Sequence, residues 1–409
     1  MDAIGNNITR HTAEMTELLS ALVAIPSVSG QERALTEFVA DWAGRQGWDV
    51  DLWQADEDEL RRLGPLPPKF IPLSGRPTLV TRIRGTGGGR SLMFNAHSDV
   101  VAAPHPARWR FGPWSGVVHD GKLYGRGACD TKGPLVSALW AMRALDDMGT
   151  PLAGDLMLEL IPGEEDCVGL GTLTSIARGH RCDGLIVLEP SESLPRCASR
   201  GGLRFEVTVL GSAVHGTVKW LGQDAIALVP RVLEVLARLE SRWNDRKADQ
   251  LFDLYPLMRP ITVDAVHGGT WQGMVCDRCD IGGYFELLPG DDLDEWSRGF
   301  VSTVGEELVD AQTPSQRFQV AIVERYDGHA TPITDPLCMA AAPANWSAFN
   351  SGCEAGLRAK LHKTPTLIWG PGSLAQAHCV DEWVELAEVA AVAESFFRTA
   401  LTYCGRTTI

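Results

Sequence analysis

The sequence predicts an α/β protein in which a mostly parallel sheet, flanked by helices, is interrupted by a smaller α+β unit. Length is the first observation, because a chain of 409 residues exceeds one ordinary hydrophobic core. The second is that short apolar runs alternate with helical patterns near both ends of the chain, which is typical of a parallel sheet. The third is a change of pattern close to residue 200. We therefore predict one unit from residues 1–198 and 329–409, and an inserted unit from residues 199–328.

The first unit begins with helices and continues into strands. Apolar residues recur at helical spacing over residues 11–25 and 33–47, and the second pattern stops at a glycine. The glycine run at residues 86–90 lacks the Gly-Lys-Ser/Thr of a phosphate loop and separates two strands, so we expect a hairpin turn there. The remaining elements expected in this half are strands within residues 78–85, 91–100, 154–161 and 182–188, and a helix over residues 132–149.

The inserted unit combines strands and helices in another order. Three strands and two amphipathic helices in about 130 residues are typical of ferredoxin-like α+β units. The strands are expected within residues 202–216, 277–290 and 317–328, and the helices over 224–243 and 291–310. The first pattern then resumes, with strands at 364–372 and 377–384 and a final helix at 385–401.

Composition narrows the class of protein. The chain has 44% hydrophobic and 22% charged residues, as soluble globular proteins do. Its formal net charge of −15 argues against nucleic acid or an anionic membrane as a partner. We see neither a secretory signal nor an apolar run long enough for a membrane span. The ten cysteines form no disulfide framework, and the close pair Cys276 and Cys279 indicates structural thiols rather than half a zinc knuckle. We therefore expect a cytoplasmic protein that acts on a small molecule.

The main chemical signal is a set of ionisable residues at the carboxyl ends of strands or just before a helix. In an open α/β sheet, the loops at these ends meet at one crevice. So many carboxylates in one place are costly unless a divalent metal neutralises them, and two metals would do so better. Mixed histidine and carboxylate ligation suits zinc, with cobalt or manganese as alternatives. The residues are His97, Asp99, Asp130, Glu164, Glu165, Glu189 and His378.

Each of these residues has an ordinary structural interpretation when taken alone. A histidine at a strand end, such as His97 or His378, is more often a hydrogen-bonded core residue than a ligand. Asp130 precedes a helix and would serve as its N-cap, and adjacent loop glutamates are usually solvated. Their equivalent positions around one sheet favour the metal site.

Five motifs in order carry a resemblance that covers nearly the whole chain. They are HSDVV, GRGACDTKG, PGEED, LEPS and GPGSLAQAHCVDEWV. In these motifs the chain resembles the metal-dependent amidohydrolases and peptidases that include acetylornithine deacetylase, succinyl-diaminopimelate desuccinylase, aminoacylase-1 and carboxypeptidase G. The last motif favours the acetylornithine deacetylase branch. The resemblance implies a zinc-exopeptidase-like catalytic domain, and a lid or dimerisation domain at residues 199–328.

The resemblance also implies a role for each site residue. Asp130 would bridge two divalent metal ions, with His97 and Glu189 completing one site and Glu165 and His378 the other.

Three further residues would assist the reaction. Glu164 would be the general base that takes a proton from the metal-bridging water and passes it to the leaving amine. Asp99 would hold the ring of His97 in its ligating tautomer. His215 would reach the oxyanion of the intermediate, within its own subunit or across a homodimer formed by the lid. The peptide Asp130–Thr131 would be cis.

The sequence departs from this family where substrate is bound. An asparagine common in the relatives is replaced by Gly273, and an arginine at the end of a lid strand is replaced by Glu286. The lost arginine argues against an N-acyl amino acid held by its carboxylate, unless another cation substitutes. Candidates are Arg200, Arg204 and Arg325.

We therefore predict a hydrolase that cleaves an amide-type C–N bond of an N-acyl amino acid or a related small molecule. A deaminase of an aromatic amine and a dipeptidase are alternatives, because the same activated water would attack each electrophile. A metal-binding homologue without catalysis is disfavoured, since every expected ligand and Glu164 are present.

Overall fold

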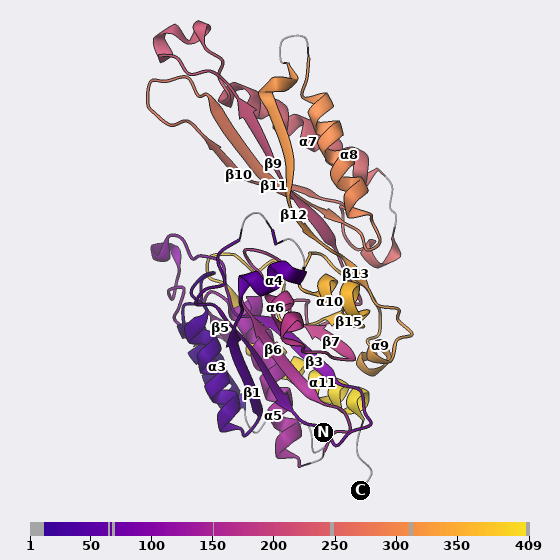
Figure 1. Ribbon diagram of the computed structural model, residues 1–409. Helices are drawn as coiled ribbons and strands as arrows, with labels where there is room; N and C mark the ends of the chain where they lie inside the picture. Colours follow the sequence, from indigo (N-terminus) through magenta and orange to yellow (C-terminus); the bar gives the residue numbers. More distant parts are fainter. Residues whose placement is uncertain are drawn as a thin grey trace.

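A six-stranded sheet organises the larger body of the protein, seen in the lower part of the computed structural model in Figure 1. The strand order is β1-β2-β6-β3-β7-β15, with β3 parallel to β6 and β7, and β15 parallel to β7. Only β2 runs antiparallel, to both β1 and β6, and the other five strands share one direction, so the predicted mostly parallel sheet is confirmed. The strands are β1 Asp49–Gln54, β2 Pro77–Ile83, β3 Leu92–His97, β6 Leu156–Ile161, β7 Gly184–Val187 and β15 Thr366–Ile368. The structure describes residues 12–63, 66–67, 70–149, 151–245, 249–310 and 314–405.

Helices cover both faces of this sheet. Every residue of β3 and β6 is buried, as expected for strands packed on two sides. One face packs against α2 Thr12–Ala24, α3 Arg33–Arg45, α5 Gly133–Asp147 and α11 Leu386–Cys404. The other face carries α6 Leu170–Arg178 and α10 Ala355–His362, with α4 Glu57–Leu63 against α6.

The hairpin expected at residues 86–90 is wrong. Strands β2 and β3 are not neighbours, because β6 lies between them and pairs with both. The glycine-rich segment instead packs against the start of β6, where the backbone amide of Gly87 donates to the carbonyl of Ala153. A turn composition indicates a chain reversal but not which strand pairs with the next.

The inserted unit forms the upper body in Figure 1. Its sheet has the order β10-β11-β9-β12, with all pairs antiparallel, and two helices cover one face. Its elements are β9 Gly201–Leu210, α7 Val229–Asn244, β10 Ile261–Gly268, β11 Arg278–Leu287, α8 Leu293–Glu307 and β12 Phe318–Tyr326. The prediction of three strands missed β10, an edge strand in which no residue is fully buried. Its apolar alternation covers only Ile261, Val263 and Ala265 before it is lost.

Two short strands lie side by side where the chain passes between the two bodies. Ser199 pairs with His329 across β8 and β13. The domain limits at 198/199 and 328/329 stay a prediction. The remaining strands and helix are β4 Val117–His119, β5 Lys122–Tyr124, β8 Ala198–Ser199, β13 His329–Ala330, α9 Pro336–Ala341, β14 Ala348–Phe349 and β16 Trp383–Glu385. Short helical turns span Pro106–Arg108, Ala128–Lys132, Gly216–Leu221, Ile226–Leu228, Gln250–Phe252 and Ser315–Arg317.

Within the described residues, no helix is both long and apolar enough to span a bilayer.

Candidate metal centre

The five predicted metal ligands lie together at the carboxyl ends of the parallel strands. His97 is the last residue of β3, and Glu189 follows β7. Glu165 lies in the loop after β6, His378 in the loop after β15, and Asp130 in the turn before α5. The Asp130–Thr131 peptide is cis, as the resemblance implied.

Asp130 contacts both histidines. Its Oδ1 lies 2.9 Å from Nε2 of His97, and its Oδ2 lies 3.5 Å from Nε2 of His378. The same His378 nitrogen is 3.1 Å from Glu165 Oε2. Asp130 therefore lies between two histidine donors, with one carboxylate oxygen toward each.

Two overlapping sets of donor atoms are close enough to share a cation. His97, Asp130 and Glu165 form one set, and His97, Glu164 and Glu189 form the other; in each, the candidate ligand atoms lie within 4.8 Å of one another. Nitrogen and carboxylate donors in this combination suit zinc and related divalent ions. The residues present therefore fit the metals that the sequence predicts.

The ring of His97 is oriented by main chain. Nδ1 of His97 lies 2.8 Å from the carbonyl oxygen of Asp99, which can only accept a hydrogen bond. Nδ1 therefore carries a proton, so that Nε2 is the ring nitrogen available to a metal ion when one is bound.

The carboxylate of Asp99 differs from the expected ring-orienting group. It lies 3.8 Å from the His97 ring nitrogen and instead accepts hydrogen bonds from the backbone amides of the loop after β6. Oδ1 accepts from Gly163 at 2.8 Å and Glu164 at 3.2 Å, and Oδ2 accepts from Glu165 at 3.1 Å. Asp99 is 1% exposed, so this is a buried anchor for the segment that carries both glutamates.

Sequence reasoning missed a second anchor, Glu382. Its Oε1 accepts from the backbone amides of Cys129 at 2.9 Å and Asp130 at 3.1 Å, and its Oε2 pairs with Arg126 at 2.6 Å. Arg126 also donates to the carbonyl of His378 at 3.3 Å. This pair ties the turn of Asp130 to the loop of His378. Glu382 lies four residues after His378 in the motif that carried the resemblance, which was the available signal.

The site holds more negative charge than the protein balances. Burial, and then repulsion from neighbouring carboxylates, raises the pKa of Glu164, Glu165 and Glu189. Burial lowers the pKa of His97, but Asp130 and the nearby glutamates outweigh it and hold that pKa well above its usual range. Crowded buried carboxylates of this kind are stabilised by a bound cation.

A third acidic group, formed by Glu32, Asp99 and Asp166, is balanced by the protein itself. Arg76, which is 1% exposed, pairs with Glu32 and with Asp166 at 2.6 Å each. This group therefore needs no metal.

A cleft of about 450 Å³ opens between the metal-site loops and the sheet of the inserted unit. Glu164, Glu165 and His378 line it from the larger body. The inserted unit contributes Arg204, Tyr284, Glu286, Glu324 and Tyr326.

The cations considered as substitutes for the family arginine are placed differently. Arg204 lines the cleft but pairs with Asp264 at 2.8 Å. Arg200 is 1% exposed and is not among the described residues that line the cleft. Arg325 contacts Asp294 on α8.

His215 and Gly273 occupy paired loops of the inserted unit. The backbone of His215 forms an isolated antiparallel β-bridge with Met274. The amide of Gly216 donates to the carbonyl of Gly273 at 2.6 Å. His215 contacts Thr217 and is not among the described residues that line the cleft.

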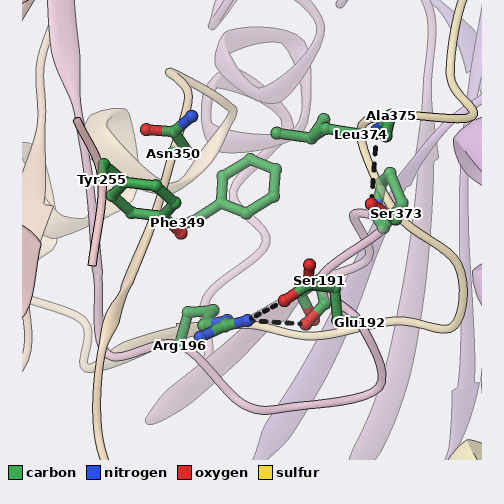
Figure 2. Close-up of a pocket in the computed structure, with 10 residues that line it drawn as sticks. Ser191, Glu192, Arg196, Tyr255, Phe349, Asn350, Ser373, Leu374 and Ala375 are labelled. Atoms are coloured by element: carbon green, nitrogen blue, oxygen red, sulfur yellow. Dashed lines mark hydrogen bonds and ion pairs between the residues drawn. The ribbon is translucent and has the colours of Figure 1, made fainter. Parts of the chain in front are cut away.

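A second cavity of about 200 Å³ is lined by Pro190, the residue after Glu189. Figure 2 shows Arg196 directed at Ser191 and Glu192. It donates to the carbonyl of Ser191 at 3.3 Å and to the carboxylate of Glu192 at 2.7 Å. The charge of this arginine is therefore already balanced.

Comparison with known proteins identifies the family to which this chain is similar. The model of peptidase family M20/M25/M40 matches residues 93–402. The chain is 24% identical to the N-formyl-4-amino-5-aminomethyl-2-methylpyrimidine deformylase of Halalkalibacterium halodurans, over 97% of this chain and 95% of the relative. It is 26% identical to the acetylornithine deacetylase of Pectobacterium atrosepticum, over 95% of this chain and 97% of the relative. Among solved structures, the di-peptidase Dug1p of Saccharomyces cerevisiae matches with a TM-score of 0.81 and 14% identity, over 98% of both chains.

Proposed function

Because this chain belongs to peptidase family M20/M25/M40 and is thus a hydrolase of carbon–nitrogen bonds, we propose that it is a metal-dependent deacylase of a small N-acylated amine or amino acid. The observation that carries the proposal is the convergence of Glu164 with His97 and Glu189 beside a cleft of small-molecule size. The two sequence relatives are named as a deformylase and a deacetylase, which are enzymes that remove short acyl groups. Their names favour a formyl or acetyl amide as the substrate.

Two divalent cations would be held around Asp130. His97 and Glu189 would complete one site, and Glu165 and His378 the other. We propose zinc, with cobalt or manganese as alternatives, because the donors are imidazole and carboxylate. When bound, the cations supply Lewis acidity that polarises the scissile carbonyl and makes water a better nucleophile.

Glu164 would act as the general base. Its carboxylate takes a proton from the attacking water as the water oxygen bonds to the amide carbon. The same carboxylate then gives this proton to the leaving nitrogen, so that the amine departs neutral and Glu164 is regenerated. Asp99 and Glu382 act as positioning residues, because they hold the loops of Glu164 and Asp130 through backbone amides.

His215 would complete the site by stabilising the oxyanion. We propose that it does so in a homodimer formed by the inserted unit. The paired loops around His215 expose Trp220 at 74% and Trp271 at 80%, and exposed apolar groups of this size are typical of protein interfaces. The free cysteines agree with a cytoplasmic location, which we propose as well.

The test is hydrolysis of a panel of N-formyl and N-acetyl amines and amino acids by the zinc-loaded protein. Glu164→Gln should lower kcat by about 10²- to 10⁴-fold, the usual contribution of a general base, while metal content stays the same. Glu234→Gln, on an exposed face of α7, is the matched control. Failure of the metal-loaded protein to hydrolyse any member, or full activity of Glu164→Gln, would overturn the proposal.

A further inference from the structure

The inserted unit presents a second buried carboxylate to the cleft, Glu286. It lies on β11, is 4% exposed, and lines the cleft together with Glu164. Tyr326 donates to its Oε1 at a long 3.3 Å, and its Oε2 has no hydrogen-bond partner among the described residues. A buried carboxylate oxygen without a donor is costly, so this position favours a ligand that supplies one.

The nearest cation does not satisfy Glu286. Arg200 attracts it but forms no ion pair with it in the part of the chain that the structure describes. Arg200 donates through Nη2 to the carbonyl of Leu257 at 2.7 Å. Burial raises the pKa of Glu286 to about 7 against this attraction. Arg200, the hydroxyl of Tyr326 and the backbone amide of Gly352 each favour the charged form of Glu286, but together they offset its burial only in part.

The surroundings of Glu286 are also acidic. Glu324, from β12, lines the same wall of the cleft, and Arg204 is the one guanidinium among the described lining residues. That guanidinium pairs with Asp264 and attracts Glu324, so its charge is already shared between two carboxylates of the inserted unit. Tyr284 and Tyr326 add aromatic carbon to this wall. A carboxylate at this wall would be repelled, whereas an N–H donor would be attracted.

We propose that Glu286 determines specificity by binding an amino group of the substrate, at a point remote from the scissile amide. The preferred substrate is then an N-acylated amine that carries a second nitrogen donor, either an ammonium group or the amino group of a heteroaromatic ring. This inference rests on the proposed deacylase function and names its substrate class. It also explains why the arginine typical of the relatives is absent here.

Three acetyl amides of matched length test the proposal. They are N-acetyl-1,4-diaminobutane, N-acetylpentylamine and N-acetyl-5-aminopentanoate, which end in an ammonium, a methyl and a carboxylate group. A second pair, an N-formyl aminomethylpyrimidine with and without a ring amino group, separates ammonium from ring amine. The wild-type protein should have a kcat/KM at least about tenfold higher for the donor-bearing member of one set, as one charged hydrogen bond predicts. The absence of such a preference in both sets, including a preference for the carboxylate or methyl compound without one for the ring amine, would overturn the inference.

Variants then attribute the preference to Glu286. In Glu286→Gln the ratio of kcat/KM between donor-bearing and methyl substrates should fall about 10- to 100-fold, mainly through KM. Glu286→Arg should reverse the preference toward the carboxylate compound, and Glu295→Gln on α8 is the control. An equal loss on all substrates would identify Glu286 as a structural partner of Arg200 and contradict the proposal.

A binding assay separates this inference from the proposed function. If the protein hydrolyses none of the amides, thermal protection by N-acetyl-1,4-diaminobutane compared with N-acetylpentylamine, and by 4-aminopyrimidine compared with pyrimidine, still reports on Glu286. Protection by an amine that Glu286→Gln abolishes would keep the amine site while the deacylase function fails. Equal protection of both proteins, or protection of neither, would refute the amine site.

Discussion

The buried carboxylate of Asp99 gives the account its most specific structural prediction. The substitution Asp99→Asn preserves the shape of the side chain but replaces one acceptor oxygen with an NH₂ group. The native carboxylate accepts from the amides of Gly163, Glu164 and Glu165 and from the hydroxyl of Ser29 at 3.0 Å. At least one of these donors must then face another donor.

The magnitude follows from the type of bond lost. A hydrogen bond to a charged group contributes about 1.5–3 kcal/mol, and the orphaned amide adds its own cost, so we expect the metal-free protein to lose about 3 kcal/mol of stability. The loop that shifts carries Glu165, and loss of a group that orients a ligand typically weakens metal binding by about 10- to 100-fold. The orientation of His97 should survive, because its ring contacts the carbonyl of Asp99.

Three measurements check this prediction. Urea unfolding of the metal-free protein gives the stability change, calorimetric titration with zinc gives the metal affinity, and NMR of the His97 Nδ1 proton reports the ring contact. Ser29→Ala, which removes one donor but leaves the carboxylate intact, should change each far less. The reasoning would be refuted if metal affinity and stability of Asp99→Asn stayed at the wild-type level, whatever the His97 signal showed.

Two other predictions follow from buried ionisable groups. Glu382→Gln leaves Arg126, which is 3% exposed, without its counter-charge, so stability should fall by about 3–5 kcal/mol and zinc affinity should fall with it; unchanged affinity would contradict the anchoring role. Burial lowers the pKa of His329 in the folded protein to about 4, whereas its pKa in the unfolded chain is the ordinary value near 6.5. Between pH 6.5 and 4, His329 is therefore neutral in the folded protein and protonated in the unfolded chain. It therefore stabilises the fold above pH 6.5, and up to about 3 kcal/mol is lost as the pH falls from 6.5 to 4. The midpoint of urea unfolding, measured as a function of pH, should fall less steeply between pH 6.5 and 4 in His329→Gln than in the wild type. Parallel curves for the two proteins would contradict the assignment.

The elements that the sequence predicts best are those with strong periodicity. The apolar start of β3, Leu92 to Phe94, and the helical pattern of α5 both coincide with elements of the structure, because elements buried on most sides have a clear apolar signature. Edge strand β10 has only a short signature, since its apolar alternation ends at Ala265 and no residue in it is fully buried. The pairing of β6 between β2 and β3 depends on a contact between distant segments, which local turn composition does not encode.

The candidate site divides in a similar way. His97, Asp130 and Glu165 could be proposed because strand ends are visible in the sequence and converge in an α/β sheet. The positioning roles of Asp99 and Glu382 could not be proposed from the sequence. Each accepts hydrogen bonds from backbone amides of a loop far away in the sequence, and no sequence pattern indicates such contacts. Substrate recognition is also a property of the fold.

The measurement that tests the central claim most directly is metal stoichiometry by elemental analysis after zinc reconstitution and gel filtration. The account predicts about two ions per wild-type chain, loss of both in Asp130→Ala, and retention of one in His378→Ala. Asp41→Ala, on the exposed side of α3, is the matched control and should bind like the wild type. A wild-type protein that binds no zinc, cobalt or manganese, or an Asp130→Ala variant with full metal content, would contradict a centre organised around Asp130.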